Sequence, residues 1–416
     1  MNESSAEEAA QCNHAALPIM SKEHSTTAIL RAGRRPAVRS GPIDEAFATL
    51  ARRPEVISFA VGAPDPGLLP VDTVATLAAE VLAEYGSTAL QYGVTRGFPP
   101  MLEQARFLLS GRGIDCPVDR LHIATGGSGA LHNLCMALLG PGAVVLVESP
   151  TYGPAVKVFR SHGARVREVG SDAEGMLPPA LDTALADPDV AFVYLLPTFQ
   201  NPTGRTMTAD RRAAIADTVV RHGALVVEDD VYPDLRYRGT PVPAFWSFAP
   251  DHTVYITSLS KTLAPALRIG IEVLPGELVD SVLALKQGID MQTSAFAQAI
   301  AARFLAGAAA ADHLVLLRKS YAAKLAAMTA ALARHFPGGY RWTEPEGGMF
   351  LWLEGPPGLN TDALLGPALE SGVAFLPGSA FFVEETPSSA MRLSFAGAPV
   401  DRIDHGIELL ARVCAE

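Results

Sequence analysis

The chain has 416 residues, of which 49% are apolar and 19% are charged, and its formal net charge is −11. At roughly 100–200 residues per domain, this length predicts two domains or three. The acidic balance argues against a nucleic-acid binder, because the one basic cluster is the short run Arg31–Arg39, which we interpret as a solvated arm. No window of about 18 residues is apolar and free of charge, so no membrane span is expected.

Residues 1–27 are polar, rich in alanine and without hydrophobic periodicity, which predicts a flexible tail. The tail lacks an apolar core of the kind found in secretory signals. The four cysteines form no CxxC pair and no metal-binding spacing, which favours the reducing cytoplasm. These cysteines are Cys12, Cys116, Cys135 and Cys414.

Short apolar runs alternate with helical periodicity in the first two thirds of the chain. The expected strands are 121–124, 144–147, 165–169, 191–196, 225–228, 254–257 and 269–273, and the expected helices include 129–139, 209–222 and 277–289. This alternation predicts an α/β fold with a mostly parallel sheet flanked by helices on both faces.

The pattern changes at about residue 300. An Ala/Leu-rich stretch over 301–335 predicts one or two helices, and strands are expected at 349–353, 373–376 and 391–395. We therefore expect a large domain over 71–300 and a smaller α+β domain over 301–416. Residues 28–70 are expected to form an arm that packs on the smaller domain.

Six lysines occur in the chain, and Lys261 is the one that follows an expected strand instead of lying in the tail or in a helix. Ligands of open α/β sheets bind outside the carboxyl ends of the strands, so Lys261 lies where a ligand would bind. Taken alone, an ordinary surface-loop lysine explains this position equally well.

Three other segments lie at expected strand ends. The turn TGGSGA (125–130) opens a helix, and glycines with free helix N–H groups suit an anion, although the spacing matches neither a Walker A loop nor a dinucleotide fingerprint. The segment NPTG (201–204) also reads as a turn. The segment EDDVY (228–232) offers a carboxylate and a phenol, with a loop acid as the alternative; metal binding is not expected, because no ligand spacing is nearby.

Arg392 lies inside the apolar segment MRLSF (391–395). A buried arginine is costly unless it is paired, and its fork geometry suits a carboxylate. A substrate carboxylate and an internal salt bridge are both compatible with this position.

Taken together, the segments resemble the fold-type I pyridoxal-phosphate enzymes, within the class I/II aminotransferase family and its 2-aminoadipate and aromatic aminotransferase branch. The matching phrases follow the family's order over residues 56–396. They are SFAVGAPDPGLLP (58–70), QYGVTRGFPP (91–100), TGGSGAL (125–131), ESPTYG (148–153), FQNPTG (199–204), VEDDVY (227–232), SLSKTLAPALRIG (258–270), GGMFLWL (347–353) and MRLSF (391–395).

The resemblance implies roles for the catalytic and cofactor-binding residues. Lys261 resembles the lysine that holds pyridoxal 5'-phosphate as an aldimine, and Asp229 resembles the acid paired with the pyridinium nitrogen. Tyr152 resembles the aromatic residue stacked on the ring, and Asn201 and Tyr232 resemble partners of its phenolic oxygen. The phosphate would be bound by Ser128, Gly129, Ala130, Ser258, Ser260 and Arg268.

The resemblance also implies how substrate and a second subunit take part. Arg392 resembles the arginine that binds the substrate α-carboxylate, with Asn201 and Gly62 beside it. Tyr92 matches a tyrosine that reaches the neighbouring subunit's phosphate, which implies a homodimer with shared sites. The implied reaction moves an amino group from an L-amino acid to a 2-oxo acid, with Lys261 as the base that moves the α-proton.

Two segments depart from the family's pattern, namely MQTS (291–294) and VGAP (61–64), and both are expected to line the substrate side-chain pocket. Lyase, decarboxylase or oxidase chemistry on the same scaffold stays an alternative. Arginine outnumbers lysine 27 to 6, which indicates a GC-rich genome and is compatible with specialised metabolism. A transcription regulator is a third possibility, but no helix-turn-helix pattern precedes the matching segments.

Overall fold

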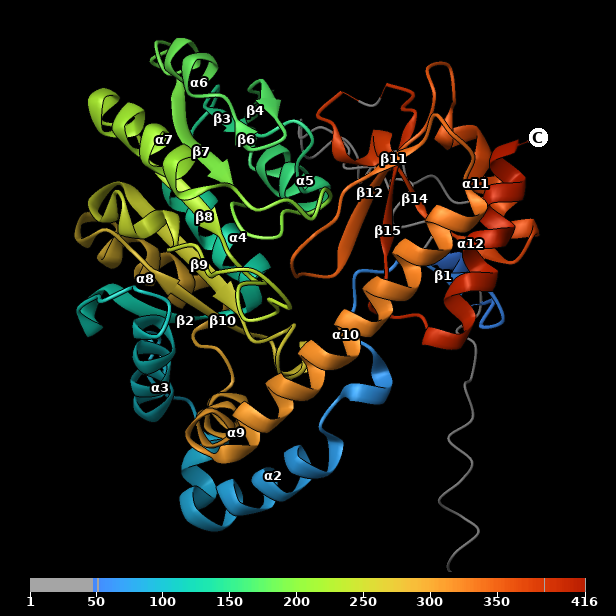
Figure 1. Ribbon diagram of the computed structural model, residues 1–416. Coiled ribbons are helices and arrows are strands. Elements are labelled where there is room, and N and C mark those ends of the chain that lie inside the picture. Colours follow the sequence, from blue (N-terminus) through green and yellow to red (C-terminus); the bar gives the residue numbers. More distant parts are fainter. Residues whose placement is uncertain (1–47, 51, 385, 416) are drawn as a thin grey trace, which may run out of the picture. The chain divides into compact units, whose positions relative to one another are not determined.

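The computed structural model describes residues 48–50, 52–384 and 386–415 (Figure 1). The expected tail over 1–27, the part of the expected arm before residue 48, the run Arg31–Arg39 and Cys12 lie outside the described residues.

A seven-stranded sheet with the order β2-β10-β9-β8-β7-β3-β4 forms the centre of the larger part of the fold. All neighbouring pairs are parallel except those of β10, which runs antiparallel to both β2 and β9. The strands are β2 (Leu121–Thr125), β3 (Val144–Val147), β4 (Arg165–Glu168), β7 (Val190–Leu195), β8 (Val226–Asp229), β9 (Thr253–Ser258) and β10 (Ile269–Val273).

Both faces of this sheet are buried. On β3, Val145 and Val147 belong to the core under α4, α5 and α8, whereas Val144 and Leu146 belong to the core under α6 and α7. This period of two is what a strand covered on both sides requires. The helices of this part are α2 (Val71–Tyr85), α3 (Pro99–Ser110), α4 (Gly126–Leu138), α5 (Gly153–Ser161), α6 (Pro178–Ala184), α7 (Ala209–His222), α8 (Gly276–Asp290) and α9 (Ala295–Ala306). A small hairpin of β5 (Ser171–Asp172) and β6 (Gly175–Met176) joins β4 to α6.

The second sheet has four antiparallel strands in the order β11-β12-β15-β14. Its strands are β11 (Arg341–Trp342), β12 (Phe350–Glu354), β14 (Leu376–Pro377) and β15 (Ala390–Ser394), and the helices α10 (Ala308–His335), α11 (Thr361–Glu370) and α12 (Val400–Ala415) accompany it. The early strand β1 (Ile57–Ser58) pairs in parallel with β13 (Val373–Ala374), so the described end of the expected arm does join this part of the fold. Figure 1 shows α10 running from α9 to this second sheet.

The expected strands of the central sheet are confirmed to within one residue at every end. The first helix after β2 starts at Gly126, three residues earlier than expected, because the glycine turn itself forms its first turn. The expected Ala/Leu-rich helix is two helices, α9 and α10, which meet at Gly307 with a bend of 82°. Within the described residues no single helix has both the length and the apolar composition of a membrane span; only α9 and α10 taken as a bent pair do.

The parallel strands place their carboxyl ends at one edge of the central sheet. The residues at or just after these ends are Thr125, Glu148, Leu196, Asp229 and Ser258. The edge therefore gathers the segments that the sequence singled out, as the strand-end rule for open α/β sheets predicts.

Candidate active site

Two adjoining cavities open at this edge of the sheet. The first has an empty volume of about 740 Å³ and the second about 610 Å³, including the part open to solvent, and five residues line both: Tyr152, Asn201, Tyr232, Lys261 and Pro265. The first is further lined by Gly127, Ser128, Leu131, Leu196, Asp229, Val231, Ser258, Ser260 and Arg268, and the second by Val61, Gly62, Ala63, Pro64, Pro154, Phe350, Leu376 and Arg392.

Lys261 stands between the two cavities, in the turn after β9. Its Nζ donates a hydrogen bond of 2.8 Å to the carbonyl oxygen of Gly62. Burial, reinforced by the nearby guanidinium groups of Arg392 and Arg268, lowers the pKa of the Lys261 amine to about 8, although Asp229 opposes the shift. A substantial share of the amine is thus neutral near physiological pH, which is the form that acts as a nucleophile or base.

Asp229 ends β8 and contributes its carboxylate to the wall of the first cavity. Its Oδ2 accepts a hydrogen bond of 2.6 Å from the hydroxyl of Tyr194, while its buried Oδ1 has no partner among the described residues. Burial raises the pKa of Asp229 to about 6; Tyr194 and Lys261 lower it and Asp230 raises it further. A buried carboxylate oxygen without a donor is costly, so Oδ1 is suited to a ligand N–H.

The glycine turn at the start of α4 contributes Gly127 and Ser128 to the cavity wall. Gly129 and Ala130 follow in the same first turn of the helix but do not line the cavity. Gly126 has a φ of +74°, and a Cβ there would lie 2.3 Å from Nη2 of Arg268. Glycine at this position therefore lets the Arg268 guanidinium pack against the start of the helix, where free N–H groups are also suited to bind an anion.

Ser258, at the end of β9, together with Ser260 and Arg268 lines the other side of this cavity. The hydroxyl of Ser258 bonds that of Ser260 at 2.8 Å and accepts the Ser260 N–H at 3.0 Å. Arg268 itself has a φ of +55°, an uncommon conformation for a residue with a side chain. Such conformations are often found at functional sites, and Arg268 lines the cavity.

The two tyrosines flank the space in front of Lys261. Tyr152 precedes the first residue of α5, and Tyr232 lies just beyond the end of β8 with its ring edge-on to Phe350 at a centroid distance of 5.8 Å. Burial raises the pKa of both phenols, so both hydroxyls stay protonated and can donate hydrogen bonds.

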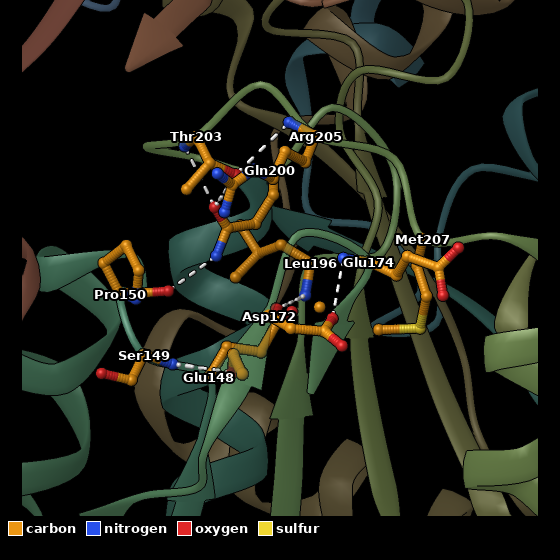
Figure 2. A pocket seen from close by; sticks show the side chains of 12 residues that line it. Glu148, Ser149, Pro150, Asp172, Glu174, Leu196, Gln200, Thr203, Arg205 and Met207 are labelled. Atoms are coloured by element: carbon orange, nitrogen blue, oxygen red, sulfur yellow. Dashed lines mark hydrogen bonds between the residues drawn. The ribbon is translucent and has the colours of Figure 1, made fainter. Parts of the chain in front are cut away.

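The loop that carries Asn201 is fixed by its own side chains (Figure 2). Gln200 donates from Nε2 to the carbonyl of Pro150 at 2.7 Å, and its Oε1 accepts the N–H of Thr203 at 3.0 Å. Where the loop begins, the N–H of Leu196 is bound by Oε2 of the buried Glu148 at 3.1 Å. These hydrogen bonds restrain the loop and therefore the position of Asn201.

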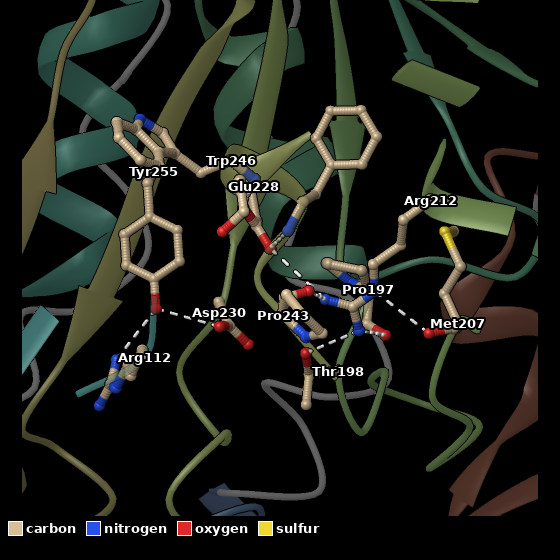
Figure 3. A network of polar contacts seen from close by, with 12 residues as sticks. Arg112, Pro197, Thr198, Met207, Arg212, Glu228, Asp230, Pro243, Trp246 and Tyr255 are labelled. Carbon is tan, nitrogen blue, oxygen red and sulfur yellow. Dashed lines mark hydrogen bonds and ion pairs between the residues drawn. The ribbon is translucent and has the colours of Figure 1, made fainter. Parts of the chain in front are cut away.

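Arg212, on α7, joins the two ends of this loop (Figure 3). It is fully buried and donates to the carbonyls of Pro197 at 2.8 Å and Met207 at 3.1 Å. It also donates to the carbonyl of Pro243 at 2.8 Å, and Glu228 lies 4.0 Å away. The same buried network continues through Tyr255, whose hydroxyl donates to Asp230 at 3.0 Å.

Arg392, on β15, is 4% exposed and reaches the second cavity. Its Nη1 donates to Oδ1 of Asn201 at 2.9 Å and its Nη2 to the carbonyl of Ala60 at 2.5 Å. The guanidinium lies over the ring of Phe350 at 4.2 Å, and no carboxylate of the described residues pairs with it. The internal salt bridge considered from the sequence is therefore not what the structure shows.

Not every residue singled out from the sequence lies at this site. Tyr92 is 74% exposed and does not line either cavity of its own chain. The segment 61–64 lines the second cavity as expected, but the segment 291–294 does not. Met291 is instead half exposed, and the hydroxyl of Thr293 bonds Lys286 and the carbonyl of Ile123 beneath the start of α4.

Sequence reasoning missed Tyr194 and Phe350. Tyr194 is the one hydroxyl-bearing residue in the apolar strand β7, and a buried tyrosine needs a hydrogen-bond partner, which was an available signal. Phe350 belongs to a matching phrase, but nothing in the sequence shows that its ring lies against both Arg392 and Tyr232.

The described groups fit pyridoxal 5'-phosphate. An amine of lowered pKa can bind its aldehyde, the unpartnered Oδ1 of Asp229 can accept its ring N–H, and the start of α4 with Arg268 can bind its phosphate. Each group is present on the wall of one cavity, and the fit uses no residue from the parts of the chain left undescribed.

Comparisons with known proteins also indicate an enzyme that uses pyridoxal 5'-phosphate. Residues 54–410 match the family model described as aminotransferase class I and II. The chain is 34% identical over 375 residues to aromatic-amino-acid aminotransferase 1 of Thermococcus litoralis, covering 88% of this chain and 90% of that one.

Solved structures show the same relationship. The kynurenine aminotransferase of Pyrococcus horikoshii, solved with PMP, superposes with a TM-score of 0.87 at 33% identity and covers 94% of this chain and 98% of its own. The α-aminoadipate aminotransferase of Thermus thermophilus, complexed with N-(5'-phosphopyridoxyl)-L-leucine, gives 0.83 at 33% identity and covers 91% and 95%.

These matches establish the fold-type I architecture and pyridoxal 5'-phosphate as the cofactor, and they support transamination over lyase, decarboxylase or oxidase chemistry. The chain therefore belongs to the family of class I and II aminotransferases, enzymes that move an amino group from an amino acid to a 2-oxo acid.

Proposed function

We propose that this aminotransferase works with Lys261, Asp229 and Tyr152 as its catalytic residues. The observation that carries the proposal is the convergence of the Lys261 amine, the free Oδ1 of Asp229 and the Arg392 guanidinium on two joined cavities. Asn201 and Tyr232 are assigned to the phenolic oxygen of the cofactor and Tyr152 to its ring face. Ser128, Gly129, Ala130, Ser258, Ser260 and Arg268 are assigned to the phosphate.

The chemistry divides between cofactor and protein. When bound, the protonated pyridine ring supplies the electron sink that makes the substrate's α C–H bond acidic. Asp229 keeps the ring nitrogen protonated. Arg392 binds the substrate α-carboxylate in two-point contact and so orients the α C–H bond toward Lys261. The Lys261 amine, mostly neutral above about pH 8, takes the α-proton and would return it to the cofactor's aldehyde carbon, which is bonded to the same nitrogen as the substrate α-carbon.

The side-chain pocket favours an apolar or aromatic substrate. Apart from Lys261 and Arg392, which already have roles, the described residues lining the second cavity carry no charge. The apolar residues that line this cavity are Val61, Ala63, Pro64, Pro154, Pro265, Phe350 and Leu376. Such a pocket suits substrates like those named for the aromatic and kynurenine aminotransferases above better than a second carboxylate.

A homodimer with shared sites is part of the proposal. Tyr92 lies on a strongly exposed apolar stretch with Leu90 and Val94, and the N–H of Gly93 bonds Gln292 next to the half-exposed Met291. An apolar patch of this kind marks an interface. We assign this patch to the contact with a second copy, with Tyr92 reaching the partner's phosphate site.

We also propose that residues 71–300 form a large domain and residues 301–416 a small domain, with α10 linking the two. The cytoplasm is proposed as the location, since the thiols of Cys116, Cys135 and Cys414 are free.

A half-reaction tests the proposal. The purified enzyme, loaded with pyridoxal phosphate, is mixed with L-phenylalanine, L-leucine, L-aspartate or L-2-aminoadipate and no oxo acid. We expect release of one oxo acid per site and no ammonia, fastest with the apolar substrates, and continued turnover only after a 2-oxo acid is added. Repeated turnover with ammonia, carbon dioxide or peroxide and no acceptor would contradict transamination. A preference for the two dicarboxylates would contradict the substrate class alone.

A further inference from the structure

The two oxygens of Asp229 are used differently. Oδ2 accepts the hydroxyl of Tyr194 at 2.6 Å, and Oδ1 has no partner among the described residues. Because the carboxylate can rotate only by breaking the bond to Tyr194, the hydroxyl decides which oxygen stays free for a ligand.

The sheet explains why Tyr194 can reach this carboxylate. On the parallel neighbours β7 and β8, Tyr194 pairs with Val227, two residues before Asp229. Residues two apart on a strand point to the same face and are about 6.6 Å apart, a gap that a tyrosine side chain spans along the strand. A phenylalanine at this position would fill the same space without reaching the carboxylate.

The ring of Tyr194 is held in place by packing in the core. It is fully buried, and Phe159 of α5 packs against it edge-on at a centroid distance of 5.2 Å. The same helix begins after Tyr152, which lines the cofactor cavity. The hydroxyl therefore has a fixed position, and Asp229 is its one acceptor among the described residues.

The ionised form of Asp229 must also be stabilised against protonation. The carboxylate is buried next to Asp230, and both burial and this neighbour favour its protonated form. Hydrogen bonds to the ionised form and the Lys261 cation oppose them. Among the described residues Tyr194 supplies the hydrogen bond, and it contributes this without occupying Oδ1.

We propose that Tyr194 is a positioning residue for the cofactor: its hydroxyl holds Oδ2 of Asp229, keeps the carboxylate ionised and reserves Oδ1 for the ring N–H. The proposal rests on the assignment of Asp229 to the ring nitrogen. It predicts that the effect of Tyr194 depends on the presence of that nitrogen.

The test measures the affinity of apoprotein for pyridoxal phosphate and for its 1-deaza analogue, in which a C–H replaces the ring nitrogen. Tyr194→Phe should weaken binding of pyridoxal phosphate by about ten- to a hundredfold, as expected for a hydrogen bond to a charged group, and leave binding of the deaza analogue almost unchanged. Tyr340→Phe, which removes a hydroxyl bond to Cys414 far from the cavities, is the matched control and should alter neither affinity.

Equal weakening of both ligands, or no weakening of either, would overturn the role of Tyr194. Thermal unfolding of each apoprotein checks its fold. If Tyr194→Phe does not fold, Phe159→Leu is used instead, which keeps the Tyr194 hydroxyl but removes the edge-on ring contacts with Tyr194 and Phe192. A smaller loss confined to pyridoxal phosphate supports the proposal, and an equal loss for both ligands overturns it. Wild-type protein that binds neither ligand would instead contradict the cofactor site itself.

Discussion

Nη1 of Arg392 and Oδ1 of Asn201 lie 2.9 Å apart and join β15 to the loop after β7. One residue is assigned to the substrate carboxylate and the other to the cofactor's phenolic oxygen, so the bond connects the two halves of the site. The buried Nε of Arg392 has no hydrogen-bond partner among the described residues.

Substitution of Arg392 should separate substrate binding from cofactor binding. We expect Arg392→Lys to raise the KM for the amino acid by at least about tenfold and Arg392→Ala by about a hundredfold or more, because a lysine cannot make the two-point contact. The affinity for pyridoxal phosphate should fall much less than this, because Asn201 loses one hydrogen bond while the other cofactor-binding residues are unchanged. Steady-state kinetics and a cofactor titration check this, and an unchanged KM would refute the role of Arg392.

The rate of cofactor loading should follow the ionisation of Lys261. Only the neutral amine attacks the aldehyde, so below the pKa the rate should fall about tenfold per pH unit, and above about pH 8 it should level off. Stopped-flow absorbance of apoprotein mixed with pyridoxal phosphate measures the profile. A rate still rising at pH 10 would mean that the amine keeps the ordinary lysine value of 10.5.

Removal of Arg212 should destabilise the protein and loosen the Asn201 loop. Arg212→Ala removes hydrogen bonds to Pro197 and Met207 and leaves Glu228 without its neighbouring cation, for an expected loss of about 3–5 kcal/mol in the free energy of unfolding. The matched control on the same helix is Arg221→Ala, an exposed pair with Asp182 that should contribute little. Denaturant unfolding compares the two, and equal losses would contradict the special role of Arg212.

Shared active sites predict complementation between two inactive variants. In Tyr92→Ala, each subunit lacks the side chain that it contributes to its partner's active site. In Lys261→Ala, each subunit lacks the lysine of its own active site. Unfolded together and refolded as a mixture, they should recover about a quarter of the wild-type activity, because half of the dimers are mixed and each has one complete site. Failure of the mixture to exceed either variant alone would contradict the shared site.

The sequence predicted the central sheet well because most of its strands, such as β3, are short apolar runs buried on both faces, although the edge strand β4 is partly exposed and carries charged residues. It also predicted which segments meet, since strand ends of a parallel sheet lie at one edge. It did not predict the contacts that depend on side-chain reach across strands, such as Tyr194 to Asp229, or on packing between the two sheets, such as Arg392 between Asn201 and Phe350.

The segment 291–294 shows a further limit. The resemblance to the family leads us to expect it at the substrate pocket, but it does not line the second cavity of its own chain, and the hydroxyl of Thr293 has an acceptor in the carbonyl of Ile123 and a donor in Lys286. Only the fold shows that both partners are buried there. The sequence pattern gives the position of a segment along the chain, but it does not give the direction in which the side chains of that segment point.

The attachment of the cofactor to Lys261 can be measured directly. Reduction of the loaded enzyme with borohydride fixes the carbon–nitrogen bond between cofactor and lysine, and peptide mass spectrometry then locates it among the chain's six lysines. We expect the phosphopyridoxyl group on Lys261 alone, and its loss together with the visible absorption band in Lys261→Ala. Labelling of another lysine, or a retained band with full turnover in the variant, would contradict the assignment of this site.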